Sequence, residues 1–79
     1  MGKEYLIACN LPDRIDPQQL LDTLANPSNT DGWTAFTASV ETEGFYFCDN
    51  CWSDAATVAL RKLIDSALLH CDEVSVREP

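Results

Sequence analysis

The chain has 79 residues, enough for one domain with a single modest core and too few for an enclosed cavity of substrate size. Its 13 acidic residues outnumber the five basic ones, and the formal net charge is −8. Such a charge disfavours direct binding to nucleic acids or anionic membranes; it favours basic protein surfaces, and it also serves solubility. Between residues 15 and 60 the chain has no lysine or arginine and carries Asp16, Asp22, Asp31, Glu41, Glu43, Asp49 and Asp54.

The pattern predicts a first strand over residues 4–11, apolar on both faces as in a central strand. This run is interrupted by Asn10 and is too short for a membrane span or a signal peptide, so a cytoplasmic location is expected. A helix start follows, with Asp16 as N-cap and Pro17 at the first helical position, and Asn26-Pro27 ends the helix. Its expected buried stripe is Leu20, Leu21 and Leu24.

Alternating apolar residues predict strands over residues 33–42 and 45–48, joined by a tight turn at Glu43-Gly44. A long helix over residues 53–71 follows, with Ser53 as a plausible N-cap, and a strand over residues 73–77 closes the chain. Apolar residues at helical spacing form its expected buried stripe: Ala56, Leu60, Leu63, Ile64, Ala67, Leu68 and Cys71.

The predicted element order is strand, helix, strand, strand, helix, strand. With short connections and right-handed crossovers, this order favours a four-stranded antiparallel sheet in the order 4-1-3-2 that carries both helices on one face. The sequence therefore predicts an α+β fold of the ferredoxin-like type, a single domain over residues 1–79 whose second sheet face is open.

Two segments resemble the RNA-recognition motif. The run LIACNLP at residues 6–12 is similar to the first-strand signature of that family, and EGFYFC at residues 43–48 is similar to its third-strand signature. In that family, aromatic side chains at three positions of these strands project from the open face and stack on bases. The resemblance implies that the stacking positions are Ile7, Phe45 and Phe47.

The chain departs from this family at three positions. Ile7 stands where the first strand has an aromatic residue, Tyr46 replaces a small residue, and Glu43 replaces a basic one. One stacking platform is lost and the phosphate contact is reversed in charge, which points to a protein partner rather than RNA. The predicted protein-binding surface combines four apolar and four acidic residues: Tyr5, Ile7, Phe45, Phe47, Glu41, Glu43, Asp49 and Asp54. Covering of the aromatic residues by a loop, or their pairing across a homodimer, is the alternative.

Four cysteines form the other notable pattern. Cys48 and Cys51 have the CxxC spacing of a redox or metal half-site, just before a helix. The predicted topology places Cys9 and Cys71 at the far end of that helix, about 27 Å away at 1.5 Å per residue. The thiols are therefore expected in two separate pairs that no single metal can join, and reduced structural thiols without a cofactor are the preferred interpretation.

No pattern in the sequence predicts an enzyme, because His70 is the only histidine and no glycine-rich phosphate loop is present. The leading hypothesis is a small acidic module that docks on a basic, nucleic-acid-binding surface of a partner protein as an inhibitor or adaptor, its carboxylates taking the place of phosphates. In size and charge it resembles anti-CRISPR proteins, which are small phage-encoded inhibitors. The alternatives are an RNA-recognition-type module that binds RNA or a peptide, and a thiol module that uses the CxxC pair for redox chemistry or metal binding.

Overall fold

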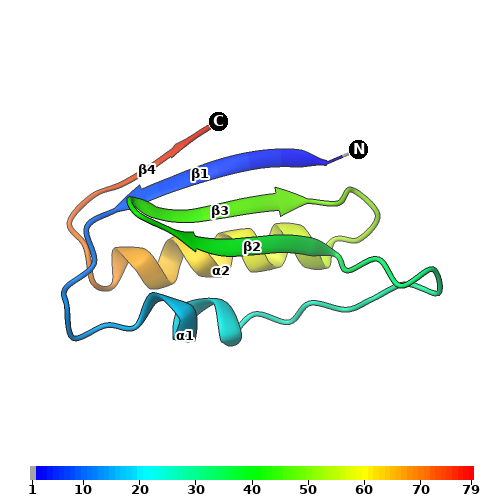
Figure 1. Ribbon diagram of the computed structural model, residues 1–79, viewed down its shortest axis with the longest axis horizontal. Coiled ribbons are helices and arrows are strands. Elements are labelled where there is room, and N and C mark those ends of the chain that lie inside the picture. Colours follow the sequence, from blue (N-terminus) through cyan, green and yellow to red (C-terminus); the bar gives the residue numbers. More distant parts are fainter. Residues whose placement is uncertain (1) are drawn as a thin grey trace.

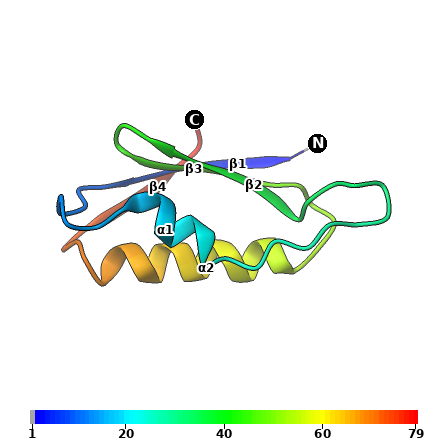
Figure 2. The same ribbon diagram turned by 60° about the horizontal axis from the view of Figure 1, so that its bottom comes forward.

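Two layers make up the computed structural model, which describes residues 2–79: an antiparallel sheet, and two helices packed against one of its faces (Figures 1 and 2). This is the small α+β architecture that the sequence predicts. The elements follow one another as β1 (Lys3–Cys9), α1 (Pro17–Asp22), β2 (Phe36–Glu41), β3 (Gly44–Asp49), α2 (Ala55–Leu68) and β4 (Val74–Arg77).

The sheet has the strand order β2-β3-β1-β4, and every neighbouring pair is antiparallel. Counted from the β4 edge, the same order reads 4-1-3-2. The register places Phe47 of β3 between Tyr5 of β1 and Ala38 of β2. The side chains of these three residues therefore lie on one face of the sheet.

The core fills the space between this face and the helices. The rings of Phe36 and Phe47 stack with their centroids 4.8 Å apart and an interplanar angle of 17°. Helix α2 contributes Leu63 and three small residues, which let the helix axis lie close to the sheet. The buried apolar residues are Ile7, Leu21, Leu24, Ala35, Phe36, Phe45, Phe47, Ala56, Ala59, Leu63 and Ala67.

Helix α1 begins as the sequence predicts. The side chain of Asp16 accepts a hydrogen bond from the Gln18 amide at 3.0 Å, and Pro17 occupies the first turn. The helix ends earlier than expected, at Asp22, because the hydroxyl of Thr23 donates to the Leu20 carbonyl at 2.8 Å and closes the last turn.

The segment between α1 and β2 is not helical, and hydrogen bonds of the Asn26 side chain and of the backbone fix its position. Asn26 donates to the Phe36 carbonyl at 2.9 Å and accepts from the Phe36 amide at 3.1 Å. The Ala35 amide donates to the Pro27 carbonyl at 2.8 Å. These bonds use the backbone groups at the start of β2, so this strand begins at Phe36 and not at Trp33 as the alternating pattern predicts.

Helix α2 is shorter than predicted, and its N-cap lies one residue after the expected cap, Ser53. Asp54 is its N-cap residue, while the Ser53 hydroxyl accepts from the Ala55 amide at 3.1 Å. Its buried stripe includes Ala59, which the sequence pattern missed, and leaves Leu68 about half exposed. Neither helix in residues 2–79 has the length and apolar composition that crossing a membrane requires.

Candidate protein-binding surface

The apolar half of the predicted binding surface lies in the core. Ile7 and Phe45 are 1% exposed and Phe47 is fully buried, while the ring of Tyr5 lies half-buried beside Phe47 with a centroid distance of 6.4 Å. The prediction that these four residues form an exposed patch is wrong, because strand alternation turns them toward the helices. The stacking positions implied by the RNA-recognition motif are wrong for the same reason.

The open face of the sheet is made of the alternate residues in each strand. Leu6 of β1 lies opposite Tyr46 of β3, and Tyr46 lies opposite Ser39 of β2. Tyr46 contributes the only aromatic ring on this face within residues 2–79. The rest of the face is mostly small, polar or charged: Glu4, Ala8, Thr37, Glu41, Cys48, Ser75 and Arg77.

Tyr46 is bound into this face. Its hydroxyl donates to Glu4 Oε2 at 3.2 Å. Partial burial, and then the neighbouring Cys48 thiol and Glu4 carboxylate, raise the pKa of Tyr46 to about 12. The ordinary tyrosine pKa of 10.0 already keeps the phenol protonated near neutral pH, where it donates its hydrogen bond to Glu4, and the shift extends this state to higher pH.

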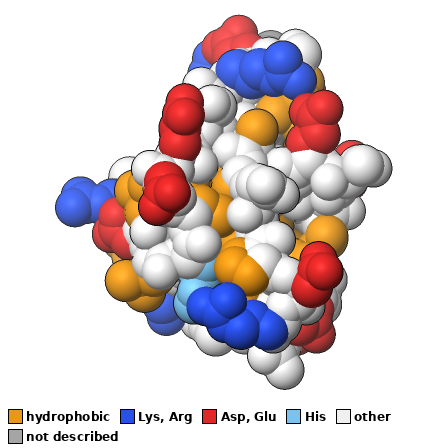
Figure 3. All heavy atoms as spheres, turned by 90° about the vertical axis from the view of Figure 1, so that its left-hand side faces the viewer, with side chains coloured by type: hydrophobic (Ala, Val, Ile, Leu, Met, Phe, Trp, Pro, Cys, Tyr) orange, Lys and Arg blue, Asp and Glu red, His pale blue; other side chains and the backbone are white. Residues whose placement is uncertain are grey.

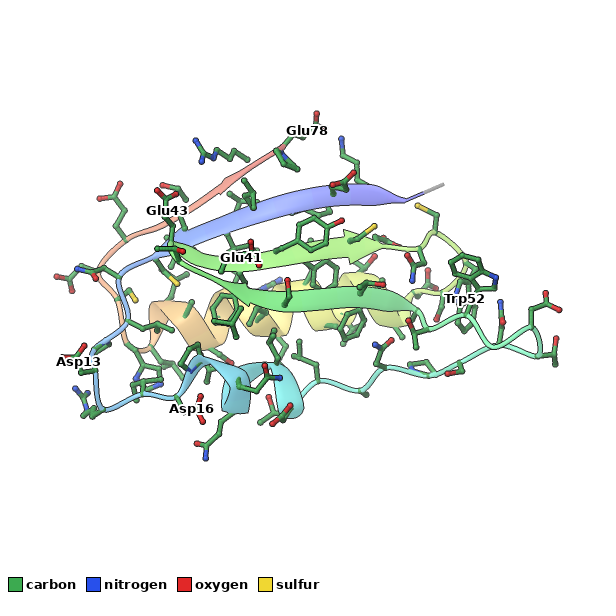
Figure 4. The ribbon with its side chains drawn as sticks, in the orientation of Figure 1. Asp13, Asp16, Glu41, Glu43, Trp52 and Glu78 are labelled. Atoms are coloured by element: carbon green, nitrogen blue, oxygen red, sulfur yellow. The ribbon has the colours of Figure 1, made fainter. Side chains whose placement is uncertain are left out.

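Acidic residues gather at the end of the molecule where the β2–β3 hairpin turns. The connections β1–α1, β2–β3 and α2–β4 all meet there, because β1 ends where β3 and β4 begin. Figure 4 shows Asp13, Asp16, Glu41 and Glu43 at this end, and Figure 3 shows acidic side chains spread over it. We call this surface the hairpin end; its carboxylates are Asp13, Asp16, Glu41, Glu43, Asp72 and Glu73.

The hairpin is held tightly against β1. Gly44 has a φ of +150°, and a Cβ at this position would lie 2.0 Å from the Ile7 carbonyl oxygen. The Cys9 amide donates to the Glu43 carbonyl at 2.9 Å. The glycine therefore permits the close approach that fixes Glu43 above the end of β1.

Shallow grooves flank the hairpin turn. One of about 270 Å³ opens on the sheet face between Leu6, Glu43 and Arg77, and another of about 290 Å³ separates Glu41 from Asp13 of the β1–α1 connection. Arg77 lies 3.7 Å from Glu43, but both side chains are well exposed, at 64% and 75%. Such an exposed pair is weak. Arg14 lies on the β1–α1 connection of the same end, so carboxylates outnumber basic side chains there but are mixed with them (Figure 3).

The four predicted acidic contact residues do not form one surface. Glu41 and Glu43 lie at the hairpin end, whereas Asp49 ends β3 and Asp54 precedes α2, at the opposite end of the sheet. Two further carboxylates line grooves with this pair and were not predicted: Asp13 shares a groove with Glu41, and Glu73 shares one with Glu43. The predicted strand order could have identified such neighbours, because it brings three connections to the same end of the sheet.

The cysteines lie at both ends of the sheet, and all four are free. Cys9 lies near Cys71, and burial followed by this neighbouring thiol raises the pKa of Cys9 to about 11. At the other end, Cys51 is exposed with a φ of +65°, and its amide donates to Asp49 Oδ1 at 2.7 Å. Residues 2–79 contain no group of three or more His, Cys, Asp or Glu side chains placed to hold a metal ion.

Comparison with known proteins finds no matching family model, no matching curated protein and no matching solved structure.

Proposed function

We propose that this chain is a small acidic protein-binding module with a ferredoxin-like fold, and that its hairpin end docks on a basic, nucleic-acid-binding surface of a partner protein. The observation that carries the proposal is the gathering of carboxylates from three connections that are far apart in the sequence. The module acts as an inhibitor or adaptor, and anti-CRISPR-type inhibition is one form of this activity.

The charge of the hairpin end and the anchoring of its connections support this proposed docking surface. The carboxylates of the hairpin end stand on connections between packed elements, and backbone hydrogen bonds such as the one from the Cys9 amide to the Glu43 carbonyl hold part of these connections before binding. A basic surface that normally contacts phosphates can accept carboxylates in their place, because both groups present anionic oxygens to Arg and Lys. The same charge repels nucleic acid, so the partner is a protein.

The test begins with a pull-down from the native host, read by mass spectrometry, and continues with association kinetics on the partner so identified. We expect the association rate to fall as salt rises. Reversing two charges in Glu41→Lys with Glu43→Lys should slow association by about tenfold and change dissociation less, because exposed charges act mainly by steering. The nucleic acid that the partner binds should compete with the module.

The matched control is the double variant Asp22→Lys with Asp65→Lys, which changes the net charge equally on the exposed sides of α1 and α2. It should slow association much less than the hairpin-end variant. Equal effects of the two variants would show that only net charge matters. Binding that does not depend on salt would remove the electrostatic basis of the proposal.

A further inference from the structure

The end of the molecule opposite the hairpin carries a groove between two exposed tryptophans. Trp33 is 64% exposed and Trp52 is 38% exposed, and both line a groove of about 430 Å³ together with Gly2, Asn29 and Asn50. Figure 4 shows Trp52 at this end, beside the segment that leads into β2. Tryptophan is enriched at binding hot spots, and two of them exposed in one groove suggest a binding site.

Hydrogen bonds hold the two walls of this groove together. The Thr34 carbonyl accepts from Trp52 Nε1 at 2.7 Å and from Asn50 Nδ2 at 2.9 Å, which joins the loop before β2 to the loop after β3. On the first loop, Asn29 Oδ1 accepts from the amides of Asp31 and Trp33 at 2.9 and 3.0 Å. The groove is therefore preorganised, and much of its polar lining already has partners within the protein.

The charge around the groove is negative. The residues that line the groove are uncharged, but Asp31 and Asp54 lie exposed on the same two loops, and Asp49 ends β3 next to the groove residue Asn50. Within residues 2–79, none of the three forms an ion pair with a lysine or arginine. Lys3 is the cation nearest to the groove along the chain, next to Gly2, and its side chain pairs with Glu78, where both side chains are exposed. Aromatic rings among uncompensated carboxylates favour a cationic ligand.

We propose that this groove binds an arginine side chain of a protein partner, with its guanidinium against the indole rings and the carboxylates around it. Charge complementarity selects a cation, and the two exposed indoles favour guanidinium over ammonium. A guanidinium is planar and weakly hydrated and stacks on aromatic faces, whereas an ammonium is a strongly hydrated point charge. This site is separate from the hairpin end, and it gives the module a second contact with its own chemistry.

The probe is the peptide acetyl-Gly-Gly-Arg-Gly-Gly-amide, compared with the same peptide carrying citrulline, which keeps the shape of arginine and removes its charge. Binding is followed by the NMR signals of the indole N–H groups. We expect the arginine peptide to shift these signals and the citrulline peptide to bind about tenfold more weakly. Trp33→Leu should abolish the shift at Trp52. Val58→Ala, which replaces an exposed apolar residue on α2 outside the groove, should leave binding unchanged.

A second variant tests the charges without touching the aromatic rings. Asp31→Asn with Asp54→Asn should weaken the arginine peptide several-fold and leave the citrulline peptide unaffected. Equal binding of the two peptides, binding unchanged by Trp33→Leu, or no shift at about 10 mM peptide would overturn the proposal. Glu41→Lys with Glu43→Lys should not weaken peptide binding more than the control Asp22→Lys with Asp65→Lys. The result for the tryptophan groove is therefore independent of whether the hairpin end binds a partner.

Discussion

At the scale of single residues, Gly44 positions the acidic hairpin. A side chain there would need a φ of +150° and would bring Cβ to 2.0 Å from the Ile7 carbonyl oxygen, which is backbone in the central strand and cannot move aside. We therefore expect Gly44→Ala to lower the free energy of unfolding by about 2 kcal/mol or more, measured by urea denaturation.

Gly32 supplies the matched control. Its φ is +85°, but a Cβ there meets nothing within 4 Å. Gly32→Ala therefore carries the cost of backbone strain alone, about 1 kcal/mol. If the two variants were equally stable, the close contact between the hairpin and β1 would not be a constraint on the fold.

Cys9 should make stability depend on pH in the alkaline range. Burial and the neighbouring Cys71 raise the pKa of Cys9 from its ordinary value of 9.0 to about 11, so the folded protein holds this thiol proton more tightly than the unfolded chain does. The resulting stabilisation is fully present below about pH 9 and is lost as pH rises through about 11. Urea denaturation across this range should show a steeper loss of stability for the wild type than for Cys9→Ala.

A packing control separates titration from the loss of a buried side chain. Val74 lies opposite Cys9 in the sheet and is also half-buried, but it does not titrate. Val74→Ala should lower stability by a similar amount at every pH. The same pH slope in wild type and Cys9→Ala would contradict the role assigned to the thiol.

At the scale of elements, helix α2 should depend on one large residue. Leu63 is fully buried, and the other buried residues of the helix are the alanines Ala56, Ala59 and Ala67. Leu63→Ala should therefore cost about 2–5 kcal/mol of unfolding free energy. Val58→Ala on the exposed side should change it by no more than about 0.5 kcal/mol, and a similar cost for both would show that the helix does not pack through this stripe.

The sequence predicted the order of elements and the start of α1 because those signals are local. Asp16 and Pro17 fix a helix start by their own chemistry, and alternation reveals a strand within a few residues. The end of α1 was missed because the Thr23 and Asn26 side chains compete with the helix, and the Asn26 bonds depend on a residue ten positions away.

The choice of sheet face could not be made from β1 alone, since Leu6 and Ala8 on one side are as apolar as Ile7 and Cys9 on the other. The hairpin did contain the answer. In β2 the residues Thr37, Ser39 and Glu41 make one side polar, and the register of the two-residue turn sets Phe45 opposite Val40 and Phe47 opposite Ala38. A short turn therefore commits both phenylalanines to the apolar side, which is the core.

At the scale of the whole molecule, the sheet separates two surfaces of different chemistry. At the hairpin end, carboxylates lie among basic and hydrophobic side chains (Figure 3), and the opposite end offers two exposed tryptophans with fewer carboxylates. The regional acidity seen along residues 15–60 thus does not fold into one patch, because the antiparallel strands carry successive acidic residues to alternate ends. Only the topology shows which carboxylates lie at the same end of the sheet.

The same whole-molecule view bears on nucleic acid. A net charge of −8 repels a phosphate backbone. Among residues 2–79 the open sheet face has a single aromatic ring, Tyr46, whereas single-strand binding uses several rings beside cationic tracks. We therefore expect no binding of fluorescently labelled single-stranded RNA at physiological salt up to about 100 μM protein, measured by anisotropy.

The matching variant is Tyr46→Ala, because Phe45 and Phe47 are core residues whose removal would unfold the protein rather than test stacking. A micromolar affinity that Tyr46→Ala abolishes would contradict this prediction and establish base stacking on the open face. A micromolar affinity that survives in Tyr46→Ala but is lost in Trp33→Leu would place nucleic acid in the tryptophan groove, against the charge argument made for an arginine there. Binding that appears only at low salt would also contradict the prediction, because weaker screening should strengthen the repulsion between this acidic protein and RNA, and only attractive contacts with the phosphates gain from it.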